Sequence, residues 1–545
     1  MEPLLKMRKI FIEGMSDEKW NPIIKGIDLT LNRGEVLGLI GESGAGKSTL
    51  GVASMAYTRM GCRIKSGSIV FDGKELFGAP KEELRKIRGN RIAYVAQSAA
   101  ASFNPAHRLI KQYAEAPVKH GLMRFEEAAK EAKDIYKRLL LPDPDHIGYR
   151  YPHQVSGGQL QRAMVAMAMA CRPDLIIFDE PTTALDVTTQ IEVLAAIKRI
   201  VRQFNTAAIY ITHDLAVVAQ IADRIMVLRY GNLVEENETR AMIENPQEDY
   251  TRRLLSVRTL HEDKDLLQSE KDVLLEVDDV TASYTGKSNV LEDIDLTIRK
   301  GRTVALVGES GSGKSTLARV ITGLLPPKKG SVIYNGKELT RELKTRPKEQ
   351  LRVMQMIYQM PDTALNPKQK VSKIIGRPLQ FYFGMESGAR EERVMELLEK
   401  IELSDKYYSR YPPELSGGEK QRICIARALA AEPDLIICDE VTSALDQLVA
   451  EGILKLLQDL QNELKVSYLF ITHDLATVKA IADEIVVMLQ GRIVEQGVKK
   501  EILKPPHDEY TELLLSSVPE MDPDWLERLL QERREKGKTS TVMDA

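Results

Sequence analysis

The stretch Gly41-Glu-Ser-Gly-Ala-Gly-Lys-Ser48 decides the fold of this chain. It follows the apolar run Val36-Leu-Gly-Leu-Ile40 and leads into a segment that can form a helix, which is the expected setting of the pattern G-x-x-x-x-G-K-S/T. Glycines let the backbone curl so that successive N–H groups face a phosphate, and the dipole of the following helix favours negative charge there. We expect Lys47 to reach the β- and γ-phosphates and the Ser48 hydroxyl to hold Mg²⁺.

The same pattern returns as Gly308-Glu-Ser-Gly-Ser-Gly-Lys-Ser315, and further motifs are also written twice. Three pairs of motifs are each separated by 260 positions: Ser156-Gly-Gly-Gln159 and Ser416-Gly-Gly-Glu419, Leu175-Ile-Ile-Phe-Asp-Glu180 and Leu435-Ile-Ile-Cys-Asp-Glu440, Ile211-Thr-His-Asp-Leu215 and Ile471-Thr-His-Asp-Leu475. Lys47 and Lys314 are separated by 267 positions, so a few residues were inserted or deleted in the early part of the repeat. The chain is therefore a tandem duplication of a domain of about 260 residues.

The composition is that of an ordinary globular protein of several domains. Charged residues make up 28% of the 545 residues, hydrophobic residues 43%, and the net charge of −3 gives no general electrostatic case for nucleic acid. No window approaches the roughly 18 apolar residues of a membrane span, and the start, Met1-Glu-Pro-Leu-Leu-Lys6, lacks the pattern of a signal peptide. The four cysteines form no C-x-x-C pair, so we expect reduced thiols in a cytosolic protein.

Each copy has the same order of predicted elements. Short strands around a turn come first, as at 68–73 and 331–336. Segments rich in Ala, Leu, Glu and Lys, about 105–155 and 368–415, have helical periodicity. Buried strand runs then alternate with helices. This order predicts an α/β fold in which each copy has a mainly parallel sheet covered by helices, plus a helical insertion.

The repeat also sets the expected domain limits. Residues 535–545 are expected to be disordered. Just before them, Trp525, Leu529 and Leu530 could form one apolar stripe of a helix, and we favour a loosely attached surface helix over a docked one. The expected parts are a first domain at 1–257, a linker at 258–272, a second domain at 273–520 and a tail at 521–545.

Paired acidic residues end one buried strand in each copy. Carboxylates at the C-terminal edge of a parallel strand lie where α/β proteins bind ligands. We expect Asp179 and Asp439 to help hold hydrated Mg²⁺. Glu180 and Glu440 are the candidates to polarise an attacking water.

A histidine and a glutamine in each copy complete this set. His213 and His473 lie 33 residues after the glutamate, where an imidazole suits a sensor that donates a hydrogen bond to a terminal phosphate. Gln97 and Gln359 follow strand-like runs. An amide there can reach Mg²⁺ or the attacking water and also report movement of the helical insertion.

The two Ser-Gly-Gly segments need a different explanation. Each would begin a helix, with a serine hydroxyl and bare glycine N–H groups that offer a second anion site. One nucleotide cannot use two anion sites at opposite ends of a domain, so the simplest solution is that each segment meets the ATP held by the other copy. The segments comprise Ser156, Gly157, Gly158 and Gln159, and Ser416, Gly417, Gly418 and Glu419.

Together these motifs resemble the ATP-binding-cassette (ABC) ATPase family over nearly all of both copies. The resemblance implies ATP and Mg²⁺ as cofactors, an antiparallel β subdomain in each copy, and head-to-tail closure that makes two composite hydrolytic sites. It implies D-loops at Ala184-Leu-Asp186 and Ala444-Leu-Asp446, and Glu419 is a mild departure from the signature motif. The residues implied to cradle phosphates are Gly41, Ser43, Gly44, Ala45, Gly46, Lys47, Ser48 and Thr49, and Gly308, Ser310, Gly311, Ser312, Gly313, Lys314, Ser315 and Thr316. The implied metal ligands are Ser48, Gln97, Asp179, Ser315, Gln359 and Asp439.

The family usually stacks adenine on an aromatic residue just before the first core strands. Tyr284 fits this role in the second copy. The corresponding stretch of the first copy contains Phe11, Gly14 and Trp20, and the sequence does not choose among them.

Three local features resemble the oligopeptide/dipeptide/nickel branch of ABC importers. They are Asn-Pro seven residues after each glutamine, Arg-Tyr-Pro before each signature, and Tyr-Thr 37 residues after each histidine: Asn104-Pro105 and Asn366-Pro367, Arg150-Tyr-Pro152 and Arg410-Tyr-Pro412, Tyr250-Thr251 and Tyr510-Thr511. The element around Tyr-Thr is imperfect, because Gln247 stands in the first copy where the second has His507. No cysteine lies near this C-terminal extension, so we expect no iron–sulfur cluster.

This branch implies an energy-coupling subunit at the cytoplasmic face of the inner membrane. It would act with two transmembrane permease subunits and an extracytoplasmic solute-binding protein, and without nucleic acid. The alternative is a soluble tandem ABC protein acting on ribosomes or DNA, but such proteins tend to carry a long charged helical linker or zinc-binding insertions. Peptides are the first expectation for the solute, and nickel chelates and glutathione-like or opine-like compounds stay open.

Overall fold

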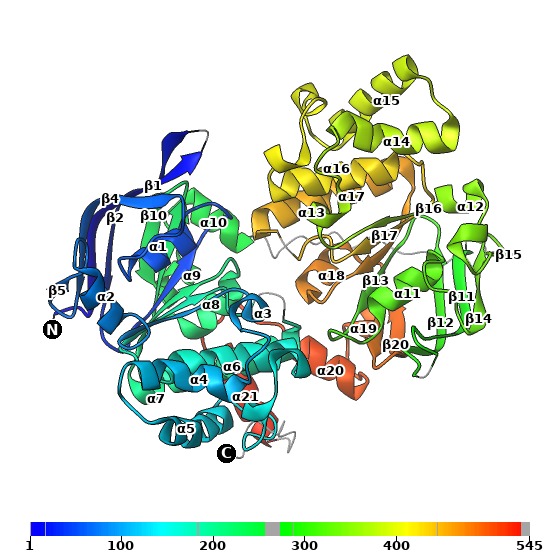
Figure 1. The fold of residues 1–545 in the computed structure, drawn as a ribbon. Helices are drawn as coiled ribbons and strands as arrows, with labels where there is room; N and C mark the ends of the chain where they lie inside the picture. The colour runs from blue at the N-terminus through cyan, green and yellow to red at the C-terminus, as the bar shows by residue number, and fades with distance from the viewer. Residues whose placement is uncertain are drawn as a thin grey trace. The chain divides into compact units, whose positions relative to one another are not determined.

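The computed structural model describes residues 2–16, 18–182, 185–256, 273–286, 288–443 and 445–535. It divides into two compact units (Figure 1). Each unit has its own apolar core. Unit 1 comprises Met1–Ser256 and Pro519–Ala545, and unit 2 comprises Val257–Val518. The expected linker at 258–272, residues 536–545 of the expected disordered end, and Ala184 and Ala444 of the D-loops lie outside the described residues.

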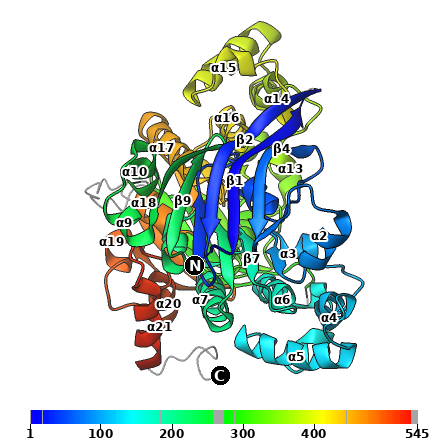
Figure 2. The same cartoon turned by 90° about the vertical axis from the view of Figure 1, so that its left-hand side faces the viewer.

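The described part of unit 1 forms two sheets. The four-stranded sheet has the order β2-β1-β4-β5 and is antiparallel, as Figure 2 shows for its first three strands. The six-stranded sheet has the order β10-β9-β3-β8-β7-β6 and is parallel except for the β9–β10 pair. The strands are β1 (Leu5–Ser16), β2 (Lys19–Leu31), β3 (Val36–Ile40), β4 (Cys62–Phe71), β5 (Lys74–Glu75), β6 (Ile92–Val95), β7 (Leu175–Asp179), β8 (Ala207–Ile211), β9 (Arg224–Arg229) and β10 (Asn232–Glu238).

Helices cover the parallel sheet of unit 1 and also form a helical subdomain in which α4, α5 and α6 contact one another (Figure 1). This subdomain is the predicted helical insertion. The α-helices are α1 (Lys47–Ala53), α2 (Lys81–Ile87), α3 (Ala99–Ser102), α4 (Leu109–Lys119), α5 (Phe125–Arg138), α6 (Gly157–Met169), α7 (Val187–Phe204), α8 (Leu215–Ile221), α9 (Thr239–Glu244), α10 (Asp249–Ser256) and α21 (Trp525–Glu535). Two short 3-10 helices are η1 (Ile147–Tyr149) and η2 (Pro152–Gln154).

The residue pattern explains why the central strands are parallel. Every residue of β3, β7 and β8 is buried, as expected for strands covered on both faces by helices. One apolar core joins side chains of the antiparallel sheet, such as Ile10 and Phe71, to side chains of the parallel sheet, such as Leu37 and Ile177. The two sheets therefore share one core, and the phosphate loop between β3 and α1 rests on it.

Unit 2 repeats this architecture. Its sheets have the orders β12-β11-β14-β15 and β16-β17-β18-β13-β19-β20, with the β19–β20 pair antiparallel. The strands are β11 (Val273–Ala282), β12 (Leu291–Arg299), β13 (Thr303–Val307), β14 (Lys329–Tyr334), β15 (Lys337–Glu338), β16 (Met354–Ile357), β17 (Leu435–Asp439), β18 (Ser467–Ile471), β19 (Glu484–Leu489) and β20 (Arg492–Val498). The helices are α11 (Lys314–Ile321), η4 (Leu343–Thr345), α12 (Lys348–Arg352), α13 (Pro361–Ala364), α14 (Val371–Phe383), α15 (Ser387–Lys400), η5 (Asp405–Tyr407), η6 (Pro412–Glu414), α16 (Gly417–Leu429), α17 (Gln447–Leu464), α18 (Leu475–Ile481), α19 (Lys499–Ile502) and α20 (Glu509–Ser516).

The C-terminal helix differs from its expectation. Helix α21 is not a loosely attached surface helix, because Trp525, Leu526 and Leu529 are at most 7% exposed. The segment from Pro519 onward packs in unit 1, although the residues just before it belong to unit 2. Burial of a tryptophan and two leucines stabilises the attached position, while the charged residues Glu527 and Arg528 stay exposed on the other side of the helix.

The turn between β9 and β10 holds the phosphate loop against the antiparallel sheet. The Gly231 N–H donates to the Ala45 carbonyl (3.2 Å), and the Gly231 carbonyl accepts from the Lys25 N–H (2.9 Å). Gly231 has a φ of +79°, and a Cβ at this position would lie 2.0 Å from the Ile23 carbonyl oxygen. Glycine is therefore required here both by the backbone conformation and by the close approach of a neighbouring backbone.

We expect Gly231→Ala to destabilise the protein by more than the roughly 1–3 kcal/mol of a strained backbone alone, because the new methyl group meets backbone rather than a movable side chain. Gly73→Ala is the matched control, since Gly73 has a φ of +76° and a Cβ added there would meet no described atom within 4 Å. Urea unfolding of both variants measures the difference. Equal losses of unfolding free energy would contradict this explanation.

Candidate active site

The predicted active-site residues of unit 1 lie at one edge of the parallel sheet. The phosphate loop follows β3, Asp179 ends β7, and Glu180 comes next. His213 lies two residues beyond β8, and Gln97 two residues beyond β6. Because β3, β8, β7 and β6 are neighbours in the sheet, their C-terminal ends bring these side chains together, where α/β proteins bind ligands.

The phosphate loops adopt the same shape in both units. The Lys47 ammonium donates to the carbonyls of Gly41 (2.6 Å) and Glu42 (2.9 Å), across its own loop. Lys314 does the same with the carbonyls of Gly308 and Glu309 (2.7 Å each). The loop tips at Ser43-Gly44 and Ser310-Gly311 are exposed, whereas Ala45, Ser312 and both lysines are buried. The exposed tips and the helix N-termini behind them suit the binding of phosphates.

Two oxygen donors meet at the start of each helix that follows a phosphate loop. The Ser48 hydroxyl donates to Asp179 (2.6 Å), and the Ser315 hydroxyl donates to Asp439 (3.0 Å). Within the described residues no group of three or more His, Cys, Asp or Glu side chains could hold a metal by itself. This donor set fits Mg²⁺, which takes one or two protein oxygens and completes its shell with phosphates and waters.

In each unit the candidate base links the predicted glutamine and histidine. Gln97 donates to Glu180 (2.8 Å), and His213 Nδ1 lies 3.2 Å from the other oxygen of Glu180. In unit 2 the corresponding distances from Glu440 are 2.6 Å to Gln359 and 3.5 Å to His473 Nδ1. Both glutamines therefore contact the candidate bases directly.

The backbone at both candidate bases is strained. Glu180 and Glu440 each have a φ of +50°, in the left-handed region that glutamate seldom adopts. Each is held there by its N–H, which donates to the neighbouring strand at Ile211 or Ile471 (2.9 Å). Such strain costs about 1–3 kcal/mol and occurs mainly at functional sites.

Charges at these sites favour protonated histidine in both units and ionised glutamate in unit 2. Burial lowers the pKa of His213, but the hydrogen bond and charge of Glu180 outweigh it, and the net pKa is raised. The pKa of His473 is raised in the same way by Glu440. Burial raises the pKa of Glu440, yet the bond to His473 and its charge leave the net pKa lowered. In unit 2 the pairing therefore keeps Glu440 in the basic form that suits a general base.

Asp179 has partners that no sequence motif indicated. Tyr94 on β6 donates to Asp179 (2.6 Å), and Arg59 forms an ion pair with the same oxygen (3.1 Å). Burial, and then Asp179, raise the pKa of Tyr94 to about 12. Met356 occupies the position of Tyr94 in unit 2, and a thioether cannot make this bond. No repeated motif marked Tyr94, because the two copies differ here.

The Tyr-Thr elements also contact the site. The Tyr250 hydroxyl accepts from the N–H of Glu42 (3.2 Å), and the Tyr510 hydroxyl accepts from the N–H of Glu309 (2.8 Å). Burial raises the pKa of Tyr250 to about 12, so its phenol stays neutral. The C-terminal part of each domain thus supports its own phosphate loop. In the sequence, the equal spacing of Tyr250 and Tyr510 from His213 and His473 was the signal that could have indicated this role.

The Ser-Gly-Gly segments begin helices, as predicted. Ser156 and Ser416 cap α6 and α16, and Gln159 and Glu419 accept from the serine N–H groups at 3.2 and 2.7 Å. Ser156, Gly157, Ser416 and Gly417 are exposed or partly exposed. The side chains of Gln159 and Glu419 are thus turned back on their own helices, which leaves serine and glycine groups on the outside.

The two units have different residues at the position predicted to stack on adenine. Tyr284 is 51% exposed, and its hydroxyl accepts from Arg319 (2.9 Å) on the helix after the phosphate loop. Ala282 pairs with Leu291 as Ile12 pairs with Ile24, so the register puts Gly14 at the place of Tyr284. The Arg63 guanidinium covers the Trp20 ring at 4.0 Å. The stacking residue of the first copy stays open.

Comparison with known proteins agrees with this geometry. A family model described as ABC transporter matches residues 24–183 and 291–443, which together are more than half of the chain. The chain belongs to the ABC transporter family. It is an ATPase with two ATP-binding cassettes. A second family model, described as oligopeptide/dipeptide transporter C-terminal region, matches residues 494–543.

Curated relatives of this ABC ATPase extend over nearly its whole length. It is 37% identical to the glutathione import ATP-binding protein GsiA of Salmonella choleraesuis (strain SC-B67), over 92% of this chain and 87% of that protein. It is 35% identical to the peptidoglycan transport ATP-binding protein YejF of Agrobacterium fabrum (strain C58 / ATCC 33970), over 95% and 96%. Among solved structures, cbiO1 from Clostridium perfringens, part of the ABC transporter complex cbiONQ, matches 42% of this chain and 90% of its own with 28% identity and a TM-score of 0.39.

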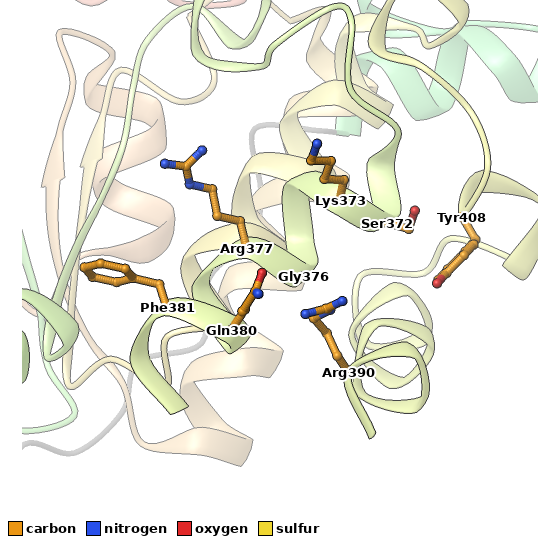
Figure 3. Close-up of a pocket in the computed structure, with 8 residues that line it drawn as sticks. All are labelled: Ser372, Lys373, Gly376, Arg377, Gln380, Phe381, Arg390 and Tyr408. Carbon is orange, nitrogen blue, oxygen red and sulfur yellow. The ribbon is translucent and has the colours of Figure 1, made fainter. Parts of the chain in front are cut away.

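The second cassette also has a hollow of about 560 Å³ away from these residues, between α14 and α15 of its helical subdomain (Figure 3). Gln380 and Arg390 face each other there, and Arg390 packs over Gly376. Its lining includes none of the predicted site residues: Ser372, Lys373, Gly376, Arg377, Gln380, Phe381, Arg390 and Tyr408.

We expect the double variant Tyr250→Phe with Tyr510→Phe to bind ATP more weakly. Each change leaves a phosphate-loop N–H without its acceptor, which costs up to about 1–3 kcal/mol. Titration with a fluorescent ATP analogue measures the affinity. Tyr230→Phe is the control, because Tyr230 is 64% exposed. Unchanged affinity in the double variant would show that the tyrosines do not support the loops.

Proposed function

We propose that this ABC ATPase is the energy-coupling subunit of an importer for peptides or related small solutes. It acts with two transmembrane permeases and an extracytoplasmic solute-binding protein. The observation that carries this proposal is the similarity along nearly the full chain to proteins named for glutathione import and peptidoglycan transport. The match to the oligopeptide/dipeptide C-terminal region supports the same class of solute.

The proposed location is the cytoplasmic face of the inner membrane, where the permeases hold the chain. Throughout the described part of the chain, each helix is too short or too polar to be a membrane span. The subdomains formed by α4–α6 and α14–α16 are the proposed docking elements, because they adjoin the segments that follow Gln97 and Gln359. Movement of these glutamines on ATP binding would then reach the permeases.

We infer two composite ATP sites, and the local geometry of each unit supports this proposal. The Ser156-Gly157 and Ser416-Gly417 groups begin separate helices and offer N–H donors to an anion. We infer that Ser416-Gly-Gly-Glu419 completes the site of Lys47, and that Ser156-Gly-Gly-Gln159 completes the site of Lys314. ATP closes this head-to-tail pair, and hydrolysis with phosphate release opens it.

Within each site the residues have separate proposed roles. Ser48 with Asp179, and Ser315 with Asp439, hold Mg²⁺, which when bound neutralises charge on the phosphates. Glu180 and Glu440 orient and deprotonate the attacking water. A histidine that now contacts the glutamate can also donate to the terminal phosphate, which would report the presence of ATP.

We expect the double variant Glu180→Gln with Glu440→Gln to lose ATP turnover by about 10²–10⁴-fold, the usual contribution of a general base. ATP should stay bound, because glutamine has nearly the same shape and keeps the contacts to glutamine and histidine. Phosphate release and retention of labelled ATP are the two measurements. Near-parental turnover would refute the assignment of the bases, and comparison of the two separate variants shows whether both sites hydrolyse equally.

A membrane pull-down tests the importer itself. Tagged chain recovered in mild detergent from its own cells should bring two permease subunits with it. Untagged chain carried through the same recovery is the control for proteins that bind the matrix by themselves. Recovery with ribosomes or DNA and no permease would favour the alternative function.

A further inference from the structure

The buried amide of Gln220 binds the end of the chain. Gln220 lies on α8 and is 1% exposed. Its Nε2 donates to the carbonyls of Glu520 (2.7 Å) and Asp522 (2.9 Å), and its Oε1 accepts from the N–H of Leu526 (3.0 Å). One side chain thus fixes three backbone groups of a segment that follows it by about 300 residues.

Apolar contacts strengthen this attachment. Trp525, Leu526 and Leu529 on α21 are 7%, 0% and 6% exposed. Removal of these large apolar side chains from water stabilises the attachment. We call residues 519–535 the C-terminal brace, because they are packed in unit 1 by both apolar and polar contacts.

Ion pairs set the orientation of the brace. Glu527 lies 3.0 Å from Lys198 and 2.9 Å from Arg202, both on α7. Arg240 on α9 lies 2.8 Å from Asp524. Exposed pairs of this kind add little affinity individually, but their positions on two helices, together with Gln220 on α8, determine how the brace can lie.

The second domain lacks three of the four side chains that bind the brace, and Lys500 stands at the position of Arg240. At 260 positions after Gln220, Lys198 and Arg202, the chain has Ala480, Gln458 and Asn462. Ala480 has no side-chain amide that could bond to the backbone of the brace. The other two have no charge to pair with Glu527. The surface therefore distinguishes the first domain from the second, although the two share a fold.

The helices that carry this surface begin beside the ATP site. Asp186, at the end of the D-loop, caps α7 by accepting from the N–H of Thr189 (3.0 Å). Asp214 caps α8 and follows His213 directly. The brace connects α7 to α8 beyond the first turn of each helix. It therefore restrains the two helices whose first residues position Asp186 and His213.

We propose that the C-terminal brace is a docking segment selective for the first ATPase domain, and that it restrains the His213 region there. The corresponding region around His473 makes no such contact within the described residues. The two ATP sites have the same candidate catalytic residues but then differ in rigidity, because the C-terminal brace packs in the first domain. Gln220 is in this sense a positioning residue, since it acts through α8.

Two variants of the full chain test this proposal from opposite sides of the contact. In a Trp20→Phe background Trp525 is the remaining tryptophan, so its fluorescence reports docking. Gln220→Ala on the domain and Leu526→Asp on the brace should each shift Trp525 emission to the red and increase acrylamide quenching several-fold. Gln458→Ala and Asn462→Ala in the second domain are the controls and should change neither. Far-UV circular dichroism confirms that each variant is folded.

Hydrogen exchange then separates a restraint from a merely attached helix. Release of the brace should speed amide exchange at 212–221 several-fold, while exchange at 472–481 stays as in the parent. Gln220→Glu, which keeps the acceptor but not the donor, should give an intermediate effect. If Trp525 stays protected in both variants, the docking assignment is wrong. If Trp525 is released but exchange at 212–221 is unchanged, the restraint is wrong.

Discussion

The parallel pairing of β6, β7, β8 and β3 is the constraint on which each ATP site depends. Asp179 at the end of β7 lies opposite Ile211 on β8, and Ile211 lies opposite Leu39 on β3. Because these strands end in register at one edge, site residues between positions 41 and 213 lie close together once the sheet has formed. The strands can be parallel and central because their residues are apolar on both faces.

Within that frame the two copies share their chemistry and differ in its surroundings. Both candidate bases have the same left-handed backbone and the same glutamine and histidine partners. In contrast, Asp179 is also bound by Tyr94 and Arg59, and the C-terminal brace packs in the unit that contains Asp179. The two units thus share the candidate catalytic side chains, whereas the residues around those side chains differ between the units.

Much of the site could be predicted because its residues lie in short, repeated motifs. Lys47 with Ser48, and Asp179 with Glu180, could be assigned together, since each pair follows a buried strand at a fixed spacing. The partners of Gln97 were harder to predict, because a long side chain can reach either Asp179 or Glu180 from the same strand end. Tyr94 and Arg59 carried no signal, because no second copy repeats them as a motif. The apolar stripe of Trp525 was visible, but not the surface that buries it.

The sequence by itself determined the duplication, the α/β class, the phosphate loops and the catalytic candidates, because these depend on local spacing and on strand and helix periodicity. Only the tertiary structure decided that Glu180 connects Gln97 to His213, that Tyr250 supports the phosphate loop, and that the end of the chain returns to the first domain. Each of these contacts joins residues far apart in the chain. Their distances depend on how sheets and helices pack, which no local pattern encodes.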